Sequence, residues 1–198
     1  TEQYREILQL ARLQYKFVSY ENIPFGERFI LWRHDCDYSL NRAFKLAEIE
    51  KEEGVASTYF INPHCEFYNL LEATQAKLVE HILGMGHSLG LHFDADFHKT
   101  GSEAELEEQI TSEAALLEQF FGSKVFAFSF HNPNECLLAH EGETYGGLLN
   151  CYSRKFQNKI PYCSDSNGYW RFRRLREVLE TADDHCLQIL THPGWWQD

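Results

Sequence analysis

The chain has 198 residues and a formal net charge of −12, and 43% of its residues are hydrophobic, 15% aromatic and 24% charged. This composition is ordinary for a globular protein and excludes a disordered chain. The acidic balance argues against a nucleic acid or an anionic membrane as the main partner, because both attract a basic surface. A chain of this length is most simply a single domain, residues 1–198, and its charge fits a neutral or cationic substrate or simply a soluble cytoplasmic surface.

The sequence contains no apolar run near the ~20 residues that span a bilayer, and its first residues do not resemble the apolar core of a signal peptide. Its six cysteines are scattered and include no CxxC pair. In a chain of this size, such cysteines are typical of reduced thiols rather than of a disulfide framework. We expect a cytoplasmic protein without a membrane span; the oligomeric state is left open.

Apolar runs alternate with amphipathic segments along the whole chain. In the first half of the chain, the pattern predicts helices over 2–14, 39–54 and 70–86 and strands at 29–32, 57–61 and 87–93. The second of these helices begins at the N-cap Ser39 and ends at Gly54. In the second half, the pattern predicts helices over 102–122 and 173–184, strands at 124–131, 161–166 and 186–192, and a less regular stretch over 132–160. This alternation predicts βαβ units and a parallel sheet, either open or closed into a barrel.

Polar clusters stand where the predicted strands end. They read RHDCD, HFDAD, HNPN, DSNGYW and THPGWW. In a parallel α/β architecture the active site lies at the carboxyl ends of the strands. Five strand ends with His, Asp or Trp therefore predict an enzyme.

Asp35 and Asp37 flank Cys36 just after the first apolar strand. Residues two apart in an extended segment point to the same side, and two close carboxylates normally share a metal or a proton. The alternative is that Asp37 caps the next helix and Asp35 is solvated. Because Ser39 is the better cap, the pattern favours a functional pair.

His92 ends a strand and is followed by Asp94 and Asp96. His92 and Asp94 share a side if the strand continues, whereas His92 and Asp96 meet if the chain turns into a helix. An imidazole with carboxylates suits Zn²⁺ or a similar divalent ion. His87, at the start of the same strand, is interpreted as structural.

His192 ends the last strand and is either a packed core residue or an acid/base group. The tryptophans near it either stack on a sugar ring or pack in the core. The stretches His131-Asn132 and Asp165-Ser166 either orient a catalytic group or form turns. The residues expected to bind substrate are His131, Asn132, Asp165, Trp170 and Trp195.

Taken in order, HDCD, GHSLGLH, SDSNGYW and ILTH resemble the motifs of the polysaccharide deacetylase family (carbohydrate esterase family 4, the NodB homology fold), over about residues 29–196. The resemblance implies an α/β fold, a distorted (β/α) barrel of about seven parallel strands. It also implies Asp35 as general base, Asp37 and His92 as metal ligands, and His192 as catalytic acid.

The chain departs from the family pattern in two places. Four residues after His92 the family has a second histidine, where this chain has Asp96. The third family motif normally carries an arginine that braces the base aspartate, where this chain offers His131. The metal ligands implied, for an ion expected to be Zn, are Asp37, His92 and a carboxylate (Asp96 or Asp94), with His131 or His98 as the other possibility.

The resemblance implies a metal-dependent hydrolase that removes an N-acetyl (or O-acyl) group from a sugar. The expected substrate is an acetylated amino sugar, a precursor in bacterial cell-envelope polysaccharide biosynthesis. Two alternatives remain: an amidohydrolase on a small non-sugar amide, as in the allantoinase-like branch, and an inactive carbohydrate-binding relic that has lost the second histidine.

Overall fold

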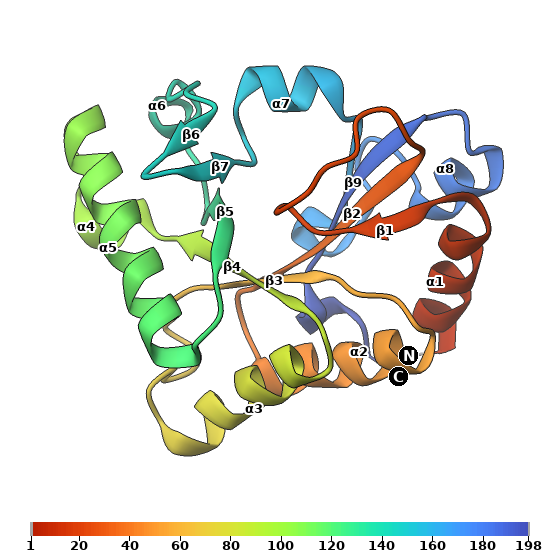
Figure 1. The fold of residues 1–198 in the computed structure, drawn as a ribbon, viewed down its shortest axis with the longest axis horizontal. Coiled ribbons are helices and arrows are strands. Elements are labelled where there is room, and N and C mark those ends of the chain that lie inside the picture. Colours follow the sequence, from red (N-terminus) through yellow and green to blue (C-terminus); the bar gives the residue numbers. More distant parts are fainter. Residues whose placement is uncertain (1, 198) are drawn as a thin grey trace.

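The computed structural model describes residues 2–197, and strands form its centre (Figure 1). The strands are β1 (Lys16–Val18), β2 (Phe29–Cys36), β3 (Thr58–Ile61), β4 (Ser88–Phe93), β5 (Val125–Phe130), β6 (Thr144–Tyr145), β7 (Leu148–Asn150), β8 (Tyr162–Ser164) and β9 (Cys186–Thr191). They form one sheet in the order β6-β7-β5-β4-β3-β2-β9-β8, and β1 pairs with the first half of β2.

The sheet is parallel except at one edge. Only β6 and β7 pair in the antiparallel sense among the described strands. The sheet curls, but within residues 2–197 no pairing joins its end strands β6 and β8, so the barrel stays open there (Figure 1). The α/β fold class and the distorted barrel predicted from the sequence are confirmed. The described residues form nine strands, where the family resemblance implies about seven.

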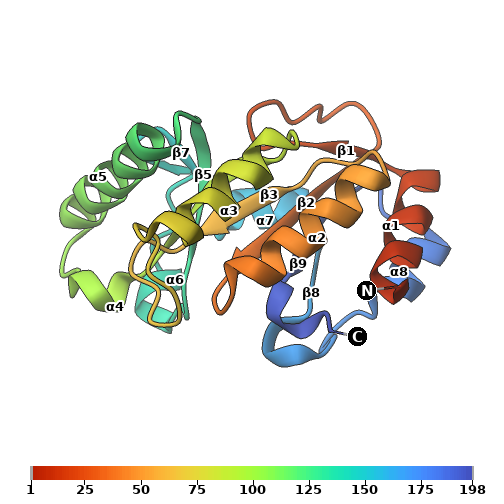
Figure 2. The same ribbon diagram turned by 90° about the horizontal axis from the view of Figure 1, so that it is seen from below.

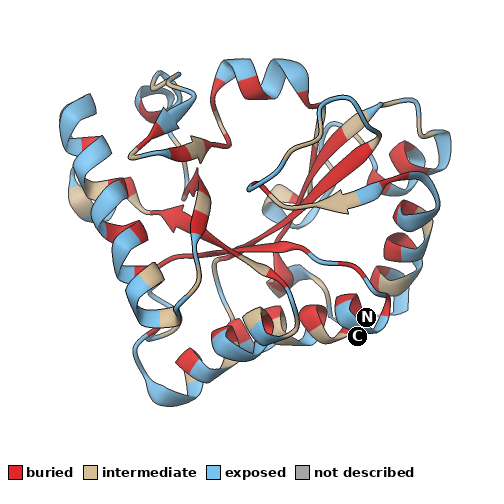
Figure 3. Ribbon diagram, viewed as in Figure 1, coloured by how far each residue is buried: buried red, intermediate tan, exposed pale blue. Residues whose placement is uncertain are grey.

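Helices lie along the outside of the curled sheet (Figures 1 and 2). They are α1 (Glu2–Gln14), α2 (Leu40–Glu52), α3 (Ala73–Gly84), α4 (Ala95–His98), α5 (Glu103–Phe121), α6 (Glu135–Leu138), α7 (Arg154–Lys159) and α8 (Leu175–Thr181), with 3₁₀ turns η1 (Ser166–Gly168) and η2 (Pro193–Trp195). Ser39 caps α2 as expected, because its side chain accepts from the backbone N–H of Arg42. The helices bury one side and expose the other, whereas the strands β2, β3, β4, β5 and β9 are buried along most of their length (Figure 3).

Strand β2 is longer than the sequence indicates. The expected apolar strand at 29–32 continues to Cys36, and all eight of its residues are buried. Arg33, His34 and Asp35 therefore lie in the interior, where each needs a polar partner. Those partners come from other elements, which is why the polar run did not predict a strand.

Glu50 of α2 is the shared partner of several buried polar side chains around β2. Its carboxylate receives hydrogen bonds from the hydroxyls of Tyr4 and Tyr59 and lies 2.7 Å from His34 Nε2, while His34 Nδ1 is 2.7 Å from Thr191 Oγ1. Burial by itself raises the pKa of Glu50, but His34 and the hydrogen bonds outweigh burial and lower it to about 2. This charged centre joins α1, α2, β2, β3 and β9 directly behind the strand that carries Asp35.

Gly90 of β4 allows the close approach of its neighbour on β3. A Cβ atom at Gly90 would lie 2.8 Å from the ring of Phe60, which is fully buried and has the guanidinium of Arg33 5.2 Å from its centroid. We expect Gly90→Ala to lower the free energy of unfolding by about 1–3 kcal/mol, as overpacking does. Gly26→Ala is the matched control, because a Cβ there meets nothing within 4 Å. Equal denaturant midpoints for the two variants would contradict this account.

No helix in residues 2–197 has the length and apolar character needed to cross a membrane. The six cysteines are free thiols, of which Cys36, Cys151 and Cys163 are buried.

Candidate active site

The polar clusters meet at the carboxyl ends of the parallel strands, as their positions in the sequence predict. Asp35 lies in β2 and Asp37 just beyond it, His92 in β4, His131 just after β5, and His192 just after β9. All five line one cavity of about 630 Å³.

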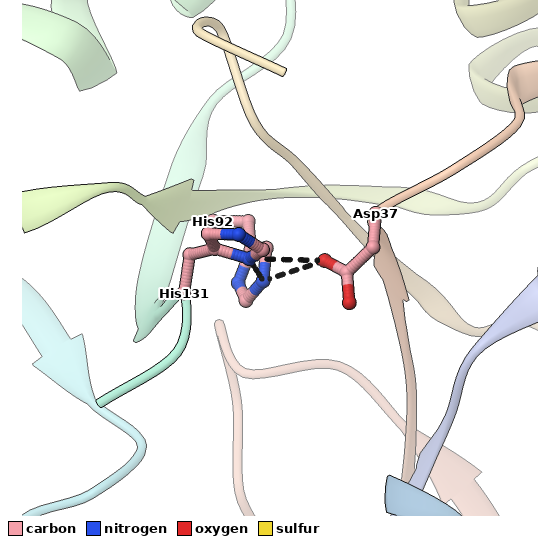
Figure 4. A group of neighbouring side chains, drawn as sticks. All are labelled: Asp37, His92 and His131. Carbon is pink, nitrogen blue, oxygen red and sulfur yellow. Dashed lines mark hydrogen bonds and ion pairs between the residues drawn. The ribbon is translucent and has the colours of Figure 1, made fainter. Parts of the chain in front are cut away.

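Asp37, His92 and His131 converge on a single point in this cavity (Figure 4). Asp37 Oδ1 is 2.9 Å from His92 Nε2 and 3.3 Å from His131 Nδ1, and the two ring nitrogens are 3.2 Å apart. Tetrahedral ligands about 2.1 Å from a zinc ion would be separated by about 3.4 Å. The three atoms are thus spaced as ligands of one small cation.

The protonation of this group also fits a cation. Asp37 Oδ1 is buried without a well-oriented hydrogen-bond donor. Burial raises the pKa of Asp37, but the close ring nitrogens of His131 and His92 outweigh burial and hold the pKa well below its usual range. An ionised carboxylate facing two imidazole nitrogens is the donor set that zinc and similar divalent ions prefer. The residues present therefore fit the divalent ion that the sequence resemblance implies.

His92 is oriented from behind by Ser129. Its Nδ1 is 2.8 Å from Ser129 Oγ, which is 3.5 Å from Asp35 Oδ1 and can donate to it. An Nδ1–H that donates to Ser129 leaves the lone pair of Nε2 directed at the point shared with Asp37 and His131. Ser129 is paired with His92 by the register of β4 and β5.

Asp35 is braced by an arginine from its own strand. Arg33 and Asp35 are 1% and 2% exposed, and their side chains form a 2.9 Å ion pair. The guanidinium lies between the rings of Phe60 and Tyr152. Burial opposes the charge of Arg33, but the carboxylate of Asp35 raises the pKa of Arg33 well above its usual value. Asp35 is therefore a fixed carboxylate, 3.7 Å from His92 Nδ1.

His192 lies close to Asp37 in the same cavity and is held by Asp165. Its Nδ1 lies 2.7 Å from Asp165 Oδ1, and its Nε2 lies 3.6 Å from Asp37 Oδ2. Asp165 also accepts from the backbone N–H of His192 and from Trp196 Nε1. Burial lowers the pKa of His192, but Asp165, Asp35 and Asp37 outweigh burial and raise it. The arrangement suits a proton donor whose Nε2–H points into the cavity.

The two aspartates expected as third ligand lie apart from the cation point. Strand β4 ends at Phe93, and Asp94 becomes the N-cap of α4, where its side chain accepts from the backbone N–H groups of Asp96 and Phe97. Asp96 is exposed in the first turn of that helix. The third side chain beside Asp37 and His92 is His131.

The other residues expected to bind substrate take three different positions. The amide of Asn132 is 2.9 Å from His131 Nε2, so it orients that ring, and it also lines the cavity. Trp195 stands on the cavity wall beside Tyr38, with ring centroids 5.3 Å apart. Trp170 lines a separate hollow and packs against a core cluster that includes residues of α1 and α8. Phe172, 90% exposed, adds an aromatic ring to the cavity.

Two residues of the site, Arg33 and Ser129, do not stand out in the sequence. Arg33 carries a signal only in retrospect, as a charged residue two positions before Asp35 on the same side of a strand. Ser129 carries none, because its role depends on the register between β4 and β5.

No family model matches the sequence, and no curated protein matches it. Solved structures do match. The catalytic domain of a peptidoglycan N-acetylglucosamine deacetylase from Eubacterium rectale has a TM-score of 0.57 at 12% identity, over 87% of this chain and 79% of that one. The deacetylase PplD from Streptococcus pyogenes, in complex with acetate, has a TM-score of 0.51 at 13% identity, over 97% and 83%. A pseudoenzyme of carbohydrate esterase family 4 from Bacillus anthracis has a TM-score of 0.52 at 13% identity, over 85% of this chain and 56% of that one.

The chain has the NodB-like fold of carbohydrate esterase family 4, which confirms at the level of fold the resemblance to polysaccharide deacetylases. It spans a little more than half the length of the Bacillus anthracis protein. Because one fold supports several activities, and the matched structures include a pseudoenzyme, the activity has to be argued from the site.

Proposed function

We propose that this protein is a metal-dependent hydrolase that removes an N-acetyl (or O-acyl) group from a sugar. The observation that carries the proposal is the convergence of Asp37, His92 and His131 on one point, with Asp35 3.7 Å from His92 and His192 3.6 Å from Asp37. A braced carboxylate and an oriented imidazole beside a cation site supply a base, an acid and an electrophile together.

Asp37, His92 and His131 would hold the ion, which we propose to be zinc. When bound, such an ion supplies a Lewis acid that polarises the acyl carbonyl and acidifies water. The ligand set contains one carboxylate and two imidazoles, which is the composition expected of the family site even though its second histidine comes from a different strand.

Asp35 acts as the general base in this proposal. It takes a proton from the attacking water, and Arg33 keeps the carboxylate in place through the 2.9 Å ion pair. Because Arg33 is buried between two aromatic rings, it cannot swing into the cavity to meet substrate. Its role is to fix the direction of the Asp35 carboxylate.

His192 acts as the general acid. The proton on Nε2 passes to the departing amine (or alcohol), and Asp165 stabilises the imidazolium from Nδ1. The raised pKa of His192 favours the protonated form that this step requires. Asp35 and His192 line the same cavity as the cation point, so a base for water and an acid for the leaving group are both within it.

The cavity wall favours a sugar as substrate. Trp195, Tyr38 and Phe172 are exposed aromatic rings that line it, and such rings stack on the apolar face of a pyranose. Together with the net charge of −12, this favours a neutral or amino-bearing sugar. We propose that the substrate is an acetylated amino sugar that bacteria use in the cytoplasm to build envelope polysaccharide. We further propose that residues 1–198 form a single catalytic domain.

A metal and product assay tests the proposal. We expect the native protein to release acetate from N-acetylated amino sugars after incubation with zinc, and to lose this activity on chelation. Asp37→Ala is expected to abolish the zinc-dependent release, whereas Asp183→Ala, an exposed aspartate, serves as the control. A zinc-loaded protein that hydrolyses only small non-sugar amides would place it with the allantoinase-like alternative, and one with no turnover on either substrate class would refute the hydrolase proposal.

A further inference from the structure

A second group of ligand-type side chains lies next to the cavity. It contains His64 from the loop after β3, His98 at the end of α4, and Glu113 in α5, with their ligand atoms within 4.8 Å of one another. His64 Nε2 is 2.6 Å from Glu113 Oε1, and His98 Nε2 contacts the same oxygen. As in the first group, two imidazole nitrogens meet one carboxylate oxygen.

The charge of Glu113 has little compensation. Its side chain is 5% exposed, and its second oxygen, Oε2, is buried with no hydrogen-bond partner. Within the part of the chain that the structure describes, its ion pairs are those with the two histidines, and no lysine or arginine lies within 4.0 Å. A buried carboxylate without a lysine or arginine partner is costly unless another positive charge joins it.

The two imidazole rings are held in place by aromatic neighbours. His64 stacks on Phe97 with ring centroids 3.5 Å apart, and His98 stacks on Phe93 with centroids 5.2 Å apart. The backbone N–H of His64 donates to Asn62 Oδ1 at 2.8 Å, which fixes the loop locally. The rings are therefore preorganised with both Nε2 atoms facing Glu113.

We propose that His64, His98 and Glu113 form a second divalent-cation site, separate from the one at Asp37, and that its ion is zinc or a metal of similar ligand preference. Two imidazoles and one carboxylate are a zinc donor set, and the partly exposed histidines leave a position open for water. The histidines come from a loop and a one-turn helix, which the ion would fasten to the long helix α5.

The position of the site gives it a structural task. His64 lies on the wall of a hollow of about 360 Å³ that Asp37 and His131 also line. An ion at His64 would hold the loop after β3, including Cys65 and Glu66, against α5 and so keep this wall in place. This role does not depend on what the first site hydrolyses.

Zinc stoichiometry and affinity test the proposal. We expect the native protein to bind about two equivalents of zinc, and the single variants His64→Ala and His98→Ala to bind about one. The second-site affinity should fall by more than ~100-fold in each, because loss of an outer-shell partner already costs ~10–100-fold. His185→Ala, at an exposed histidine outside both groups, should behave as the native protein.

Comparison with Asp37→Ala separates the two sites. That variant should keep about one equivalent, and adding His64→Ala to it should remove the remaining ion. Limited proteolysis of the loop over 62–69 should accelerate on chelation in Asp37→Ala but show no response to zinc in His64→Ala. Equal zinc binding by the native protein and His64→Ala would overturn the second site, whatever the activity of the first.

Discussion

Replacing Asp35 by asparagine should lower turnover by roughly 10²–10⁴-fold, the usual contribution of a positioned proton-transfer group. The amide keeps an oxygen that can accept from Arg33, but it cannot take a proton from water. Zinc binding at Asp37, His92 and His131 should persist, because Asp35 is 3.7 Å from the far nitrogen of His92 and does not reach the cation point. Acetate release under substrate saturation and metal content together measure the two effects.

Two controls make the Asp35→Asn result specific. Asp183→Asn removes the same charge from an exposed position and should leave turnover unchanged. The buried guanidinium of Arg33 loses the charge that neutralises it in this variant, which lowers stability. Thermal unfolding therefore has to be measured to show that the variant is folded at the assay temperature. A folded, metal-loaded Asp35→Asn protein that turns over at the native rate would show that another group is the base.

The second large effect is expected at His131. His131→Ala should weaken zinc binding at the first site by more than ~100-fold and abolish turnover with it, because the ring supplies one of three converging ligand atoms. Asp96→Ala should change neither, since Asp96 is exposed in α4. Zinc titrations of both variants show whether His131 or Asp96 supplies the third ligand of the first site.

The His131 comparison also has a clear contrary outcome. If Asp96→Ala releases zinc while His131→Ala retains it, the third ligand is the carboxylate and α4 must rearrange when the ion binds. His140→Ala is a further control, because it removes a partly buried histidine that lies after α6 and outside both groups. It should leave both zinc affinity and turnover at native values.

The sequence by itself determined the alternation of strands and helices and the edge at which the polar residues gather. Both follow from local patterns: apolar runs, an N-cap at Ser39, a C-terminal stop at Gly54, and polar residues after each strand. The presence of Asp35, Asp37, His92 and His192 in one cavity also followed, because parallel strands must end on the same side. Their chemical roles stay predictions until they are measured.

The tertiary structure decided which residues complete each group. Asp96 is close to His92 in sequence, but the chain turns into α4 at Ala95, and Asp96 is exposed there and outside the group of converging ligand atoms. His131 is 39 residues from His92 and reaches it because β5 pairs beside β4 with Ser129 opposite His92. No short turn joins β4 to β5, since α4 and α5 lie between them, so their register depends on how both strands pack in the sheet.

The same reason explains the buried charges. Arg33 and Glu50 look like surface residues in sequence, since lysine, arginine, aspartate and glutamate are rarely buried without partners. Their partners, Asp35 for one and His34, Tyr4 and Tyr59 for the other, meet them only in the folded sheet. Local sequence patterns determined at which edge of the sheet the candidate active site lies, whereas contacts between distant strands decided which side chains belong to it.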